Sequence, residues 1–157
     1  MQPRLNPQAA SPAAYTAMLN LEGFARRSKL ELSLIELVKM RTSQINGCAF
    51  CLDMHSKDAR AEGETEQRLY ALNAWRETPF FTAREQAALA WTESLTLVAQ
   101  NHVPDAVYDE VRAHFTDEEL VNLTVVINTI NAWNRIAISF RMVPGEYQPA
   151  AHKPAAQ

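Results

Sequence analysis

Hydrophobic residues recur along most of this chain at the three- and four-residue spacing of one helical face. β-Branched residues do not form the alternating runs that strands require, and only four glycines occur. The pattern therefore predicts an all-α fold, a helical bundle. Six or seven helices are expected, over about residues 12–26, 31–45, 48–62, 65–75, 82–99, 105–115 and 116–142.

Local signals set several helix boundaries. Asn46-Gly47 is a common helix-ending pair. Two capping boxes open later helices, at Thr82-x-x-Glu85 and Thr116-x-x-Glu119. The segment 148–157 is rich in proline and alanine and has little to pack, so it is expected to be a disordered tail.

Length and composition indicate a single domain over residues 1–157. The chain is 47% apolar and 21% charged, which is typical of a globular protein with a sizeable core. Its net charge is −3, and no basic cluster is longer than Arg26-Arg27. These features argue against nucleic acid as a partner.

No stretch approaches the roughly 18 unbroken apolar residues of a membrane span. The first seven residues hold no apolar core of a signal peptide, so a cytoplasmic location away from the membrane is expected. In a reducing compartment, a close cysteine pair is seldom a structural staple. The two cysteines therefore point to redox chemistry or to a metal.

Both cysteines lie in the segment 43–55, SQINGCAFCLDMH, as a CxxC pair with a histidine four residues further on. On a helix, positions i, i+3 and i+7 share a face, so Cys48, Cys51 and His55 form one stripe. Cysteines three residues apart can close a small disulfide. A neighbouring base also raises the fraction of thiolate, the form that attacks. The spacing predicts a dithiol site with its own base.

Glu36 interrupts the apolar run 34–38, where an unpaired carboxylate would cost several kcal/mol. If the helices on either side of Asn46-Gly47 fold back antiparallel, Glu36 is level with Lys57. It then lies two residues from His55 along the axis, or about 3 Å at the rise of an α-helix. A carboxylate that contacts an imidazole orients the ring and stabilises its protonated form. We therefore predict a relay from Glu36 through His55 to a thiol.

The pattern Glu-x11-Cys-x-x-Cys-x-x-x-His, from Glu36 to His55, resembles the alkyl hydroperoxidase D-like proteins of the carboxymuconolactone decarboxylase superfamily. The resemblance covers about residues 31–63. It implies an all-α subunit that forms homo-oligomers, often trimers or hexamers. It also implies a thiol peroxidase that needs no metal, flavin or other cofactor.

By this resemblance, Cys51 attacks the peroxide, and Cys48 is the proton donor and resolving thiol. Glu36 and His55 match the proton relay of the family, and a thiol or lipoyl-type reductant, either a small molecule or a protein, restores the dithiol. Phe50 departs from the best-known branch, where a histidine directly precedes the second cysteine. The residues alone leave the nucleophile open, because a helix N-terminus favours thiolate at Cys48 whereas His55 is one turn from Cys51.

The dithiol hypothesis covers a peroxidase or a disulfide oxidoreductase that cycles Cys48 and Cys51. Two other functions remain open at this point. A lactone decarboxylase, like the namesake of the superfamily, would use an acid and base pair on a small carboxylated lactone. Its activity would survive loss of both cysteines. A zinc-stabilised helical binding module would use two thiolates, an imidazole and a carboxylate. Ligands on adjoining turns of one helix, however, give poor tetrahedral angles.

Other residues carry weaker predictions. Polar side chains at helical spacing in the last helix either line the thiol pocket or an interface, or satisfy one another inside an oligomer; they are Thr124, Asn128, Asn131 and Arg135. Five aromatic residues are expected to fill the core, namely Trp75, Phe80, Phe81, Trp91 and Phe115. Three histidines are expected at the solvated surface, namely His102, His114 and His152.

Overall fold

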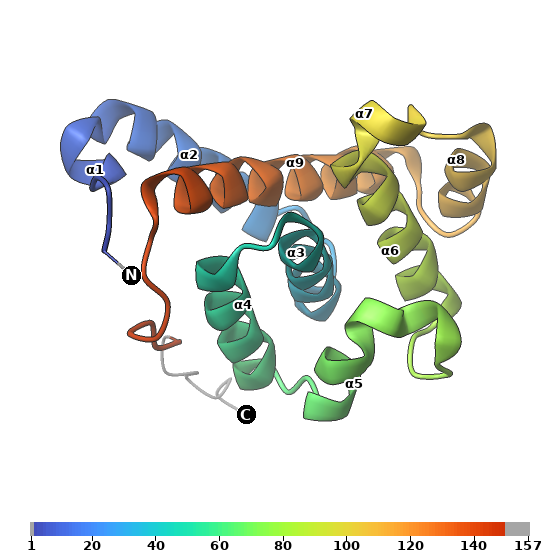
Figure 1. The fold of residues 1–157 in the computed structure, drawn as a ribbon. Coiled ribbons are helices and arrows are strands. Elements are labelled where there is room, and N and C mark those ends of the chain that lie inside the picture. Colours follow the sequence, from blue (N-terminus) through green and yellow to red (C-terminus); the bar gives the residue numbers. More distant parts are fainter. Residues whose placement is uncertain (1, 150–157) are drawn as a thin grey trace, which may run out of the picture.

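The computed structural model describes residues 2–149, which form helices and no strand (Figure 1). This confirms the all-α prediction. Of the predicted tail, 150–157 lie outside the described residues, and 148 and 149 have no regular structure. The helices are α1 (Pro7–Ala10), α2 (Pro12–Arg26), α3 (Leu32–Asn46), α4 (Ala49–Ala61), α5 (Glu66–Ala71), the 3₁₀ helix η1 (Leu72–Glu77), α6 (Ala83–Thr96), α7 (Val98–Asn101), α8 (Asp105–Arg112) and α9 (Asp117–Phe140).

Three details differ from the sequence prediction. Helix α1 was not expected; its N-cap is Asn6, whose side chain accepts a hydrogen bond from the amide of Ala9. The predicted helix 65–75 divides into α5 and η1. The predicted helix 82–99 ends at Thr96, because Leu97 leaves the helical region with φ −102° and ψ 28°.

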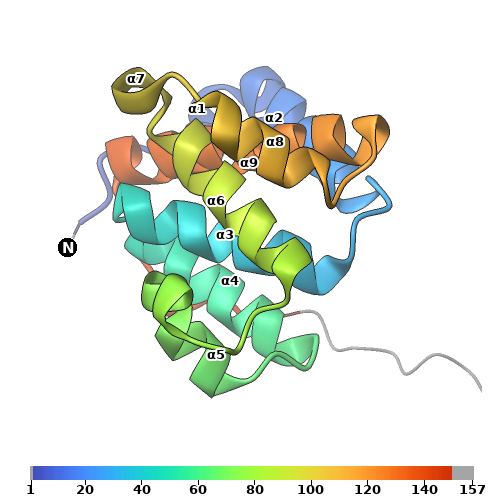
Figure 2. The same cartoon turned by 90° about the vertical axis from the view of Figure 1, so that its right-hand side faces the viewer.

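Helix α3 lies at the centre of the fold. It packs against α4 on one side, α6 on the other and α9 above (Figures 1 and 2). Contact on three sides explains why its apolar run is buried almost all round. Four polar residues of α3 are buried as well, namely Glu36, Lys39, Thr42 and Ser43.

Two apolar clusters flank α3. One joins α3 to α6, α8 and α9, and the other joins α3 to α4, α5, η1 and α6. The predicted aromatic residues lie in or against these clusters: Trp75, Phe81, Trp91 and Phe115 are buried, and Phe80 packs against them from a partly buried position. The prediction that these rings fill the core is confirmed.

Helix α9 carries the polar stripe that the sequence predicts. Thr124 accepts a hydrogen bond from the indole of Trp91 at 3.0 Å, and Asn131 donates to Thr96 at 3.2 Å. Arg135 donates to the backbone carbonyl of Asn131 at 2.8 Å, while Asn128 is exposed. Three of the four stripe residues are thus hydrogen-bonded within the chain, and none of the four lines the thiol pocket described below.

The surface predictions are confirmed for two of the histidines. His102 and His114 are exposed, and His152 lies outside the described residues. Within residues 2–149, no helix combines the length and the apolar character that a membrane crossing requires.

Candidate functional site

The CxxC pair sits at the turn between α3 and α4. Gly47 ends α3 with φ +69°, a conformation that favours glycine. The amide of Cys48 then donates to the carbonyl of Ser43 at 3.0 Å. Cys48 is therefore the N-cap of α4 rather than its first residue, and its sulfur faces the amide of Cys51 at 3.4 Å.

A network of asparagines ties this turn to α9. The side-chain amide of Asn46 donates to Asn131 at 3.0 Å and to Asn134 at 2.8 Å. The amide of Asn134 donates in turn to the hydroxyl of Ser43 at 3.1 Å. The fully buried Asn134 was missed by the sequence reasoning, although it lies one turn from Asn131. The network holds the cysteine pair at a fixed place against α9.

Cys48 and Cys51 form a disulfide, with their Cα atoms 5.4 Å apart. Both are buried, and they pack with Ile130 and Ala137 of α9. The two sulfurs differ in their access to the neighbouring pocket, because Cys51 belongs to its wall and Cys48 does not. Of the two, Cys51 is therefore the one that a pocket ligand would contact.

The predicted contact between Glu36 and His55 is confirmed. Oε2 of Glu36 lies 2.8 Å from Nδ1 of His55, and both side chains are buried. A carboxylate at this place accepts the Nδ1 proton, so the neutral ring presents Nε2 as its free base. The α3–α4 hairpin thus places the imidazole of His55 in hydrogen-bond contact with the carboxyl group of Glu36.

The surroundings favour the charged form of Glu36. Burial raises the pKa of its carboxyl group. The hydrogen bond from His55 and the nearby charges of His55, Lys39 and Arg26 outweigh burial and hold the pKa below its usual value of 4.5. Glu36 is therefore ionised at neutral pH.

Further charged residues that the sequence reasoning missed surround this pair. Lys39 is fully buried, with Nζ 2.6 Å from Glu22 and 3.8 Å from Glu36. Asp58 reaches Nδ1 of His55 at 4.0 Å, and Arg26 lies at the same distance from Asp58. Helical spacing could have identified two of these residues. Lys39 lies one helical turn after Glu36, and Asp58 lies one turn after His55.

The chain after α9 returns over α4. The hydroxyl of Tyr147 donates to Asp58 at 2.6 Å, and burial together with this bond raises the pKa of Tyr147 to about 12. Lys57 donates to the carbonyl of Tyr147 at 3.0 Å, and the amide of Gly145 donates to Asp53 at 3.0 Å. These contacts place Tyr147 beside the imidazole.

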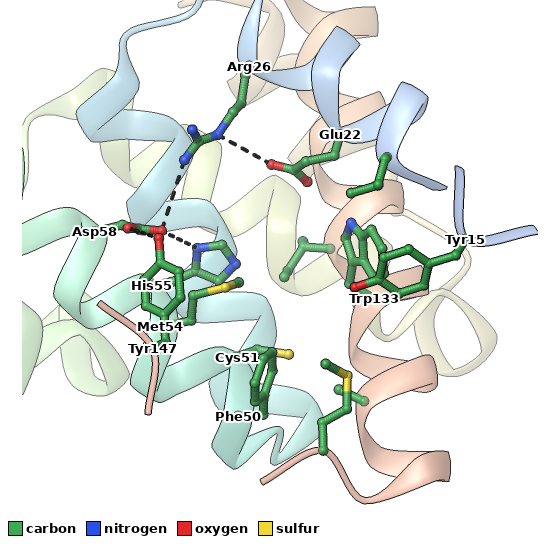
Figure 3. Close-up of a pocket in the computed structure, with 14 residues that line it drawn as sticks. Tyr15, Glu22, Arg26, Phe50, Cys51, Met54, His55, Asp58, Trp133 and Tyr147 are labelled. Carbon is green, nitrogen blue, oxygen red and sulfur yellow. Dashed lines mark hydrogen bonds and ion pairs between the residues drawn. The ribbon is translucent and has the colours of Figure 1, made fainter. Parts of the chain in front are cut away.

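A pocket of about 340 Å³ opens beside Cys51 and His55. In Figure 3, both side chains extend from α4, and Tyr15 of α2 and Trp133 of α9 lie across from them. Its apolar wall comprises Tyr15, Leu19, Phe50, Met54, Ile130, Trp133, Ala137 and Met142. Its polar end comprises Glu22, Arg26, His55, Asp58 and Tyr147. The pocket can hold a small organic molecule with its reactive group at the sulfur.

The four donors of the zinc alternative do not form one cluster. Among the described residues, the potential metal ligands that cluster within 4.8 Å are Glu36, His55 and Asp58, without either cysteine. Lys39 and Arg26 place two positive charges against these carboxylates. The donor set therefore favours internal ion pairing over a bound cation.

Fold and site together define a helical dithiol protein of the alkyl hydroperoxidase D-like type. The sequence pattern of the carboxymuconolactone decarboxylase family matches residues 10–94. YdfG of Bacillus subtilis, an uncharacterised protein, is 45% identical over 139 residues, which cover 88% of this chain and 95% of YdfG. The chain belongs to the carboxymuconolactone decarboxylase family and resembles its alkyl hydroperoxidase D-like members.

Solved structures share the fold. Protein ATU0492 of Agrobacterium tumefaciens, of unknown function and described with a suggested role as the antioxidant defence protein AhpD, is 44% identical with a TM-score of 0.88. The match covers 95% of this chain and 99% of ATU0492. The debrominase Bmp8 has a TM-score of 0.77 at 18% identity, over 88% of this chain and 75% of Bmp8. This second likeness concerns the fold alone.

Proposed function

We propose that this protein is a thiol-dependent peroxidase that reduces alkyl hydroperoxides or hydrogen peroxide in antioxidant defence. The observation that carries the proposal is the placement of Cys51 and His55 on one pocket wall, with the imidazole held by the buried carboxylate of Glu36. A base held in this way beside a thiol is the arrangement that generates an attacking thiolate. No metal or cofactor is required.

The proposed cycle reduces one peroxide and consumes one external dithiol per turnover. His55 takes the proton of Cys51, and the thiolate attacks one peroxide oxygen. The O–O bond breaks, and the departing oxygen leaves as an alcohol or water with a proton returned through His55 or Cys48. Cys51 is then a sulfenic acid. Attack by the thiol of Cys48 releases water and forms the disulfide, which a thiol or lipoyl-type reductant opens again.

The choice of Cys51 as nucleophile rests on access. Cys51 lines the pocket, whereas Cys48, the N-cap of α4, is not among its lining residues. The amide of Cys51 that faces the Cys48 sulfur would also stabilise a thiolate on Cys48, which suits the resolving thiol. Phe50 occupies the pocket wall beside Cys51 and supplies apolar contact where the best-known branch of the family has a histidine.

The proposal extends to partners and location. Large apolar side chains are exposed on α2 and α9, among them Phe24, Val121 and Ile138, and a homo-oligomer, trimeric or hexameric, would cover such side chains. A reductant that keeps the dithiol cycling fits a cytoplasmic location. Neither nucleic acid nor membrane is a proposed partner.

The decisive experiment compares peroxide consumption by the wild type, Cys51→Ser, Cys48→Ser and the double variant, each with a dithiol reductant. Wild type should turn over, and Cys51→Ser should be inactive. In a separate sample that contains peroxide but no reductant, Cys48→Ser should stop at a sulfenic acid that a dimedone-type reagent traps. Full turnover by Cys51→Ser would contradict the assignment of the nucleophile.

The same variants separate the remaining alternatives. A lactone decarboxylase would keep its activity on a carboxylated lactone when both cysteines are serine, because its acid and base would be carboxyl and imidazole groups. A zinc module would contain one tightly held zinc per chain and would unfold with a chelator. The CxxC pair at the pocket favours the peroxidase.

A further inference from the structure

Lys39 is a buried charge for which the proposed cycle has no use. Its side chain is 0% exposed, and lysine is almost never fully buried unless it is paired. The ammonium nitrogen lies 2.6 Å from Oε1 of Glu22 on α2 and 3.8 Å from Oε1 of Glu36. Lys39 therefore links the pocket wall, to which Glu22 belongs, with the carboxylate that holds His55.

We propose that Lys39, anchored by Glu22, is a positioning residue that keeps the Glu36 carboxylate charged and turned toward His55. This inference rests on the proposed function only in so far as His55 serves a thiol. It adds two residues on α2 and α3 to the relay from Glu36 to His55.

The geometry of Glu36 supports this role. Its two oxygens have different partners, since Oε2 meets Nδ1 of His55 at 2.8 Å and Oε1 faces Lys39. Rotation of the carboxylate away from His55 would also take Oε1 away from the ammonium. The contact with Glu22 is closer than the one with Glu36 and anchors the ammonium group of Lys39 to α2. The carboxylate is thus held at both ends.

Lys39 also contributes to the charge balance around His55. Three carboxylates face the cluster, namely Glu36 of α3, Asp58 of α4 and Glu22 of α2, and Asp58 also accepts from Tyr147 of the C-terminal segment. The cations that oppose them are Lys39 and Arg26, which lies 3.7 Å from Glu22 and 4.0 Å from Asp58. Neighbouring carboxylates raise one another's pKa, and a nearby cation lowers it.

Loss of the positive charge of Lys39 and loss of the negative charge of Glu22 should therefore have opposite electrostatic effects on the cluster. Without the ammonium, the carboxyl group of Glu36 would keep its proton to higher pH, because three carboxylates would face Arg26 alone. Without the charge of Glu22, the cluster would be less negative, and Glu36 would lose its proton at lower pH. A purely structural role predicts no such reversal of sign.

The test measures how fast iodoacetamide alkylates Cys51 in the reduced, full-length protein as a function of pH, with the product read by mass spectrometry. In Lys39→Met, the fall in rate on the acid side should move to higher pH by about one unit or more. In Glu22→Gln, it should move to lower pH. Lys29→Met removes an exposed lysine paired with Glu118 at the surface and should leave the profile unchanged.

Profiles of Lys39→Met and Glu22→Gln that coincide with wild type, or that shift in the same direction, would overturn the inference. Replacement of a buried ion-pair member by an apolar residue of similar length can be tolerated or can prevent folding. If Lys39→Met does not fold, Glu22→Gln and the charge-preserving Lys39→Arg decide: the first must shift to lower pH, and the second must keep the wild-type profile.

The experiment needs no peroxide, so failure of the inference can be distinguished from failure of the proposed peroxidase activity. Opposite shifts in a protein that consumes no peroxide would support the role of Lys39 and would contradict the peroxidase. Peroxide turnover with unshifted profiles would do the reverse.

Discussion

Two regions on either side of α3 bury different kinds of side chain. Toward α6, α8 and α9 lies an apolar core that includes Trp91, Phe115 and Leu123. Charges there stay at the rim, where Arg84 pairs with Glu31 and Glu119 and covers the ring of Phe115. Toward α4 and α2 lies a charged cluster, defined as Glu22, Arg26, Glu36, Lys39, His55 and Asp58.

This difference indicates that the apolar core mainly stabilises the fold, whereas the charged cluster mainly serves the chemistry of the site. Burial of apolar side chains is the main favourable contribution to folding, so the apolar core is expected to hold the molecule together. Buried ion pairs contribute little or nothing to stability, because the loss of hydration offsets their attraction. The charged cluster is therefore better explained by what it does to His55 and, through it, to Cys51.

The largest expected effect on chemistry comes from His55→Ala. Removal of a general base lowers a rate by about 10²–10⁴-fold. We expect a loss of this size in the rate at which the reduced protein consumes peroxide in a single turnover. A rate within a factor of two of wild type at neutral pH would show that the imidazole does not serve the thiol.

The apolar core is probed by Leu123→Ala. This residue is fully buried, and truncation of a buried leucine lowers the free energy of unfolding by about 2–5 kcal/mol. Urea unfolding followed by circular dichroism would measure the loss. The single-turnover rate of the folded variant should stay close to that of wild type. A large drop in rate would mean that the two regions are coupled.

The next prediction compares Glu36 and Asp58, whose carboxylates both lie near Nδ1 of His55. Glu36 lies 2.8 Å from Nδ1 of His55, whereas Asp58 lies 4.0 Å away. Because only the first is within hydrogen-bond distance, Glu36→Gln should slow peroxide consumption by about tenfold or more, or at least ~1.4 kcal/mol in barrier. Asp58→Asn should have a smaller effect. Equal effects would remove the special role of Glu36.

The smallest expected effect is that of Tyr147→Phe. The change removes one hydrogen bond to Asp58, which is worth about 0.5–1.5 kcal/mol of stability. The pKa of Tyr147 is raised to about 12, so its neutral form stabilises the fold below the usual value of 10.0. That contribution disappears as the pH rises from there toward the raised value. Urea unfolding at several alkaline pH values should show this decline in wild type only.

The α3–α4 hairpin could be predicted because its geometry depends on local signals. Gly47 ends α3, and the residue count across the turn then places Glu36 next to His55. Lys39, Glu22 and Tyr147 could not be placed in the same way. Their contacts depend on how α2 and the C-terminal segment return to α3 and α4, and this packing has no local signature.

The end of α6 and the contacts of the stripe on α9 could not be predicted for a similar reason. Leu97 leaves the helical region although nothing in its neighbourhood is a helix breaker, and the side chain of Asn101 then binds the carbonyls of Ser94 and Leu97. The stripe on α9 had several possible roles on sequence grounds. Trp91 and Thr96 on α6 are the hydrogen-bond partners of Thr124 and Asn131, and no local signal in the sequence identifies these partners.

The central claim is tested most directly by mass spectrometry of the reduced wild-type protein after one equivalent of peroxide. The account predicts the loss of two hydrogen atoms per chain and a peptide that joins Cys48 to Cys51, with one peroxide consumed for each disulfide formed. Peroxide left unconsumed while both thiols stay reduced would contradict it.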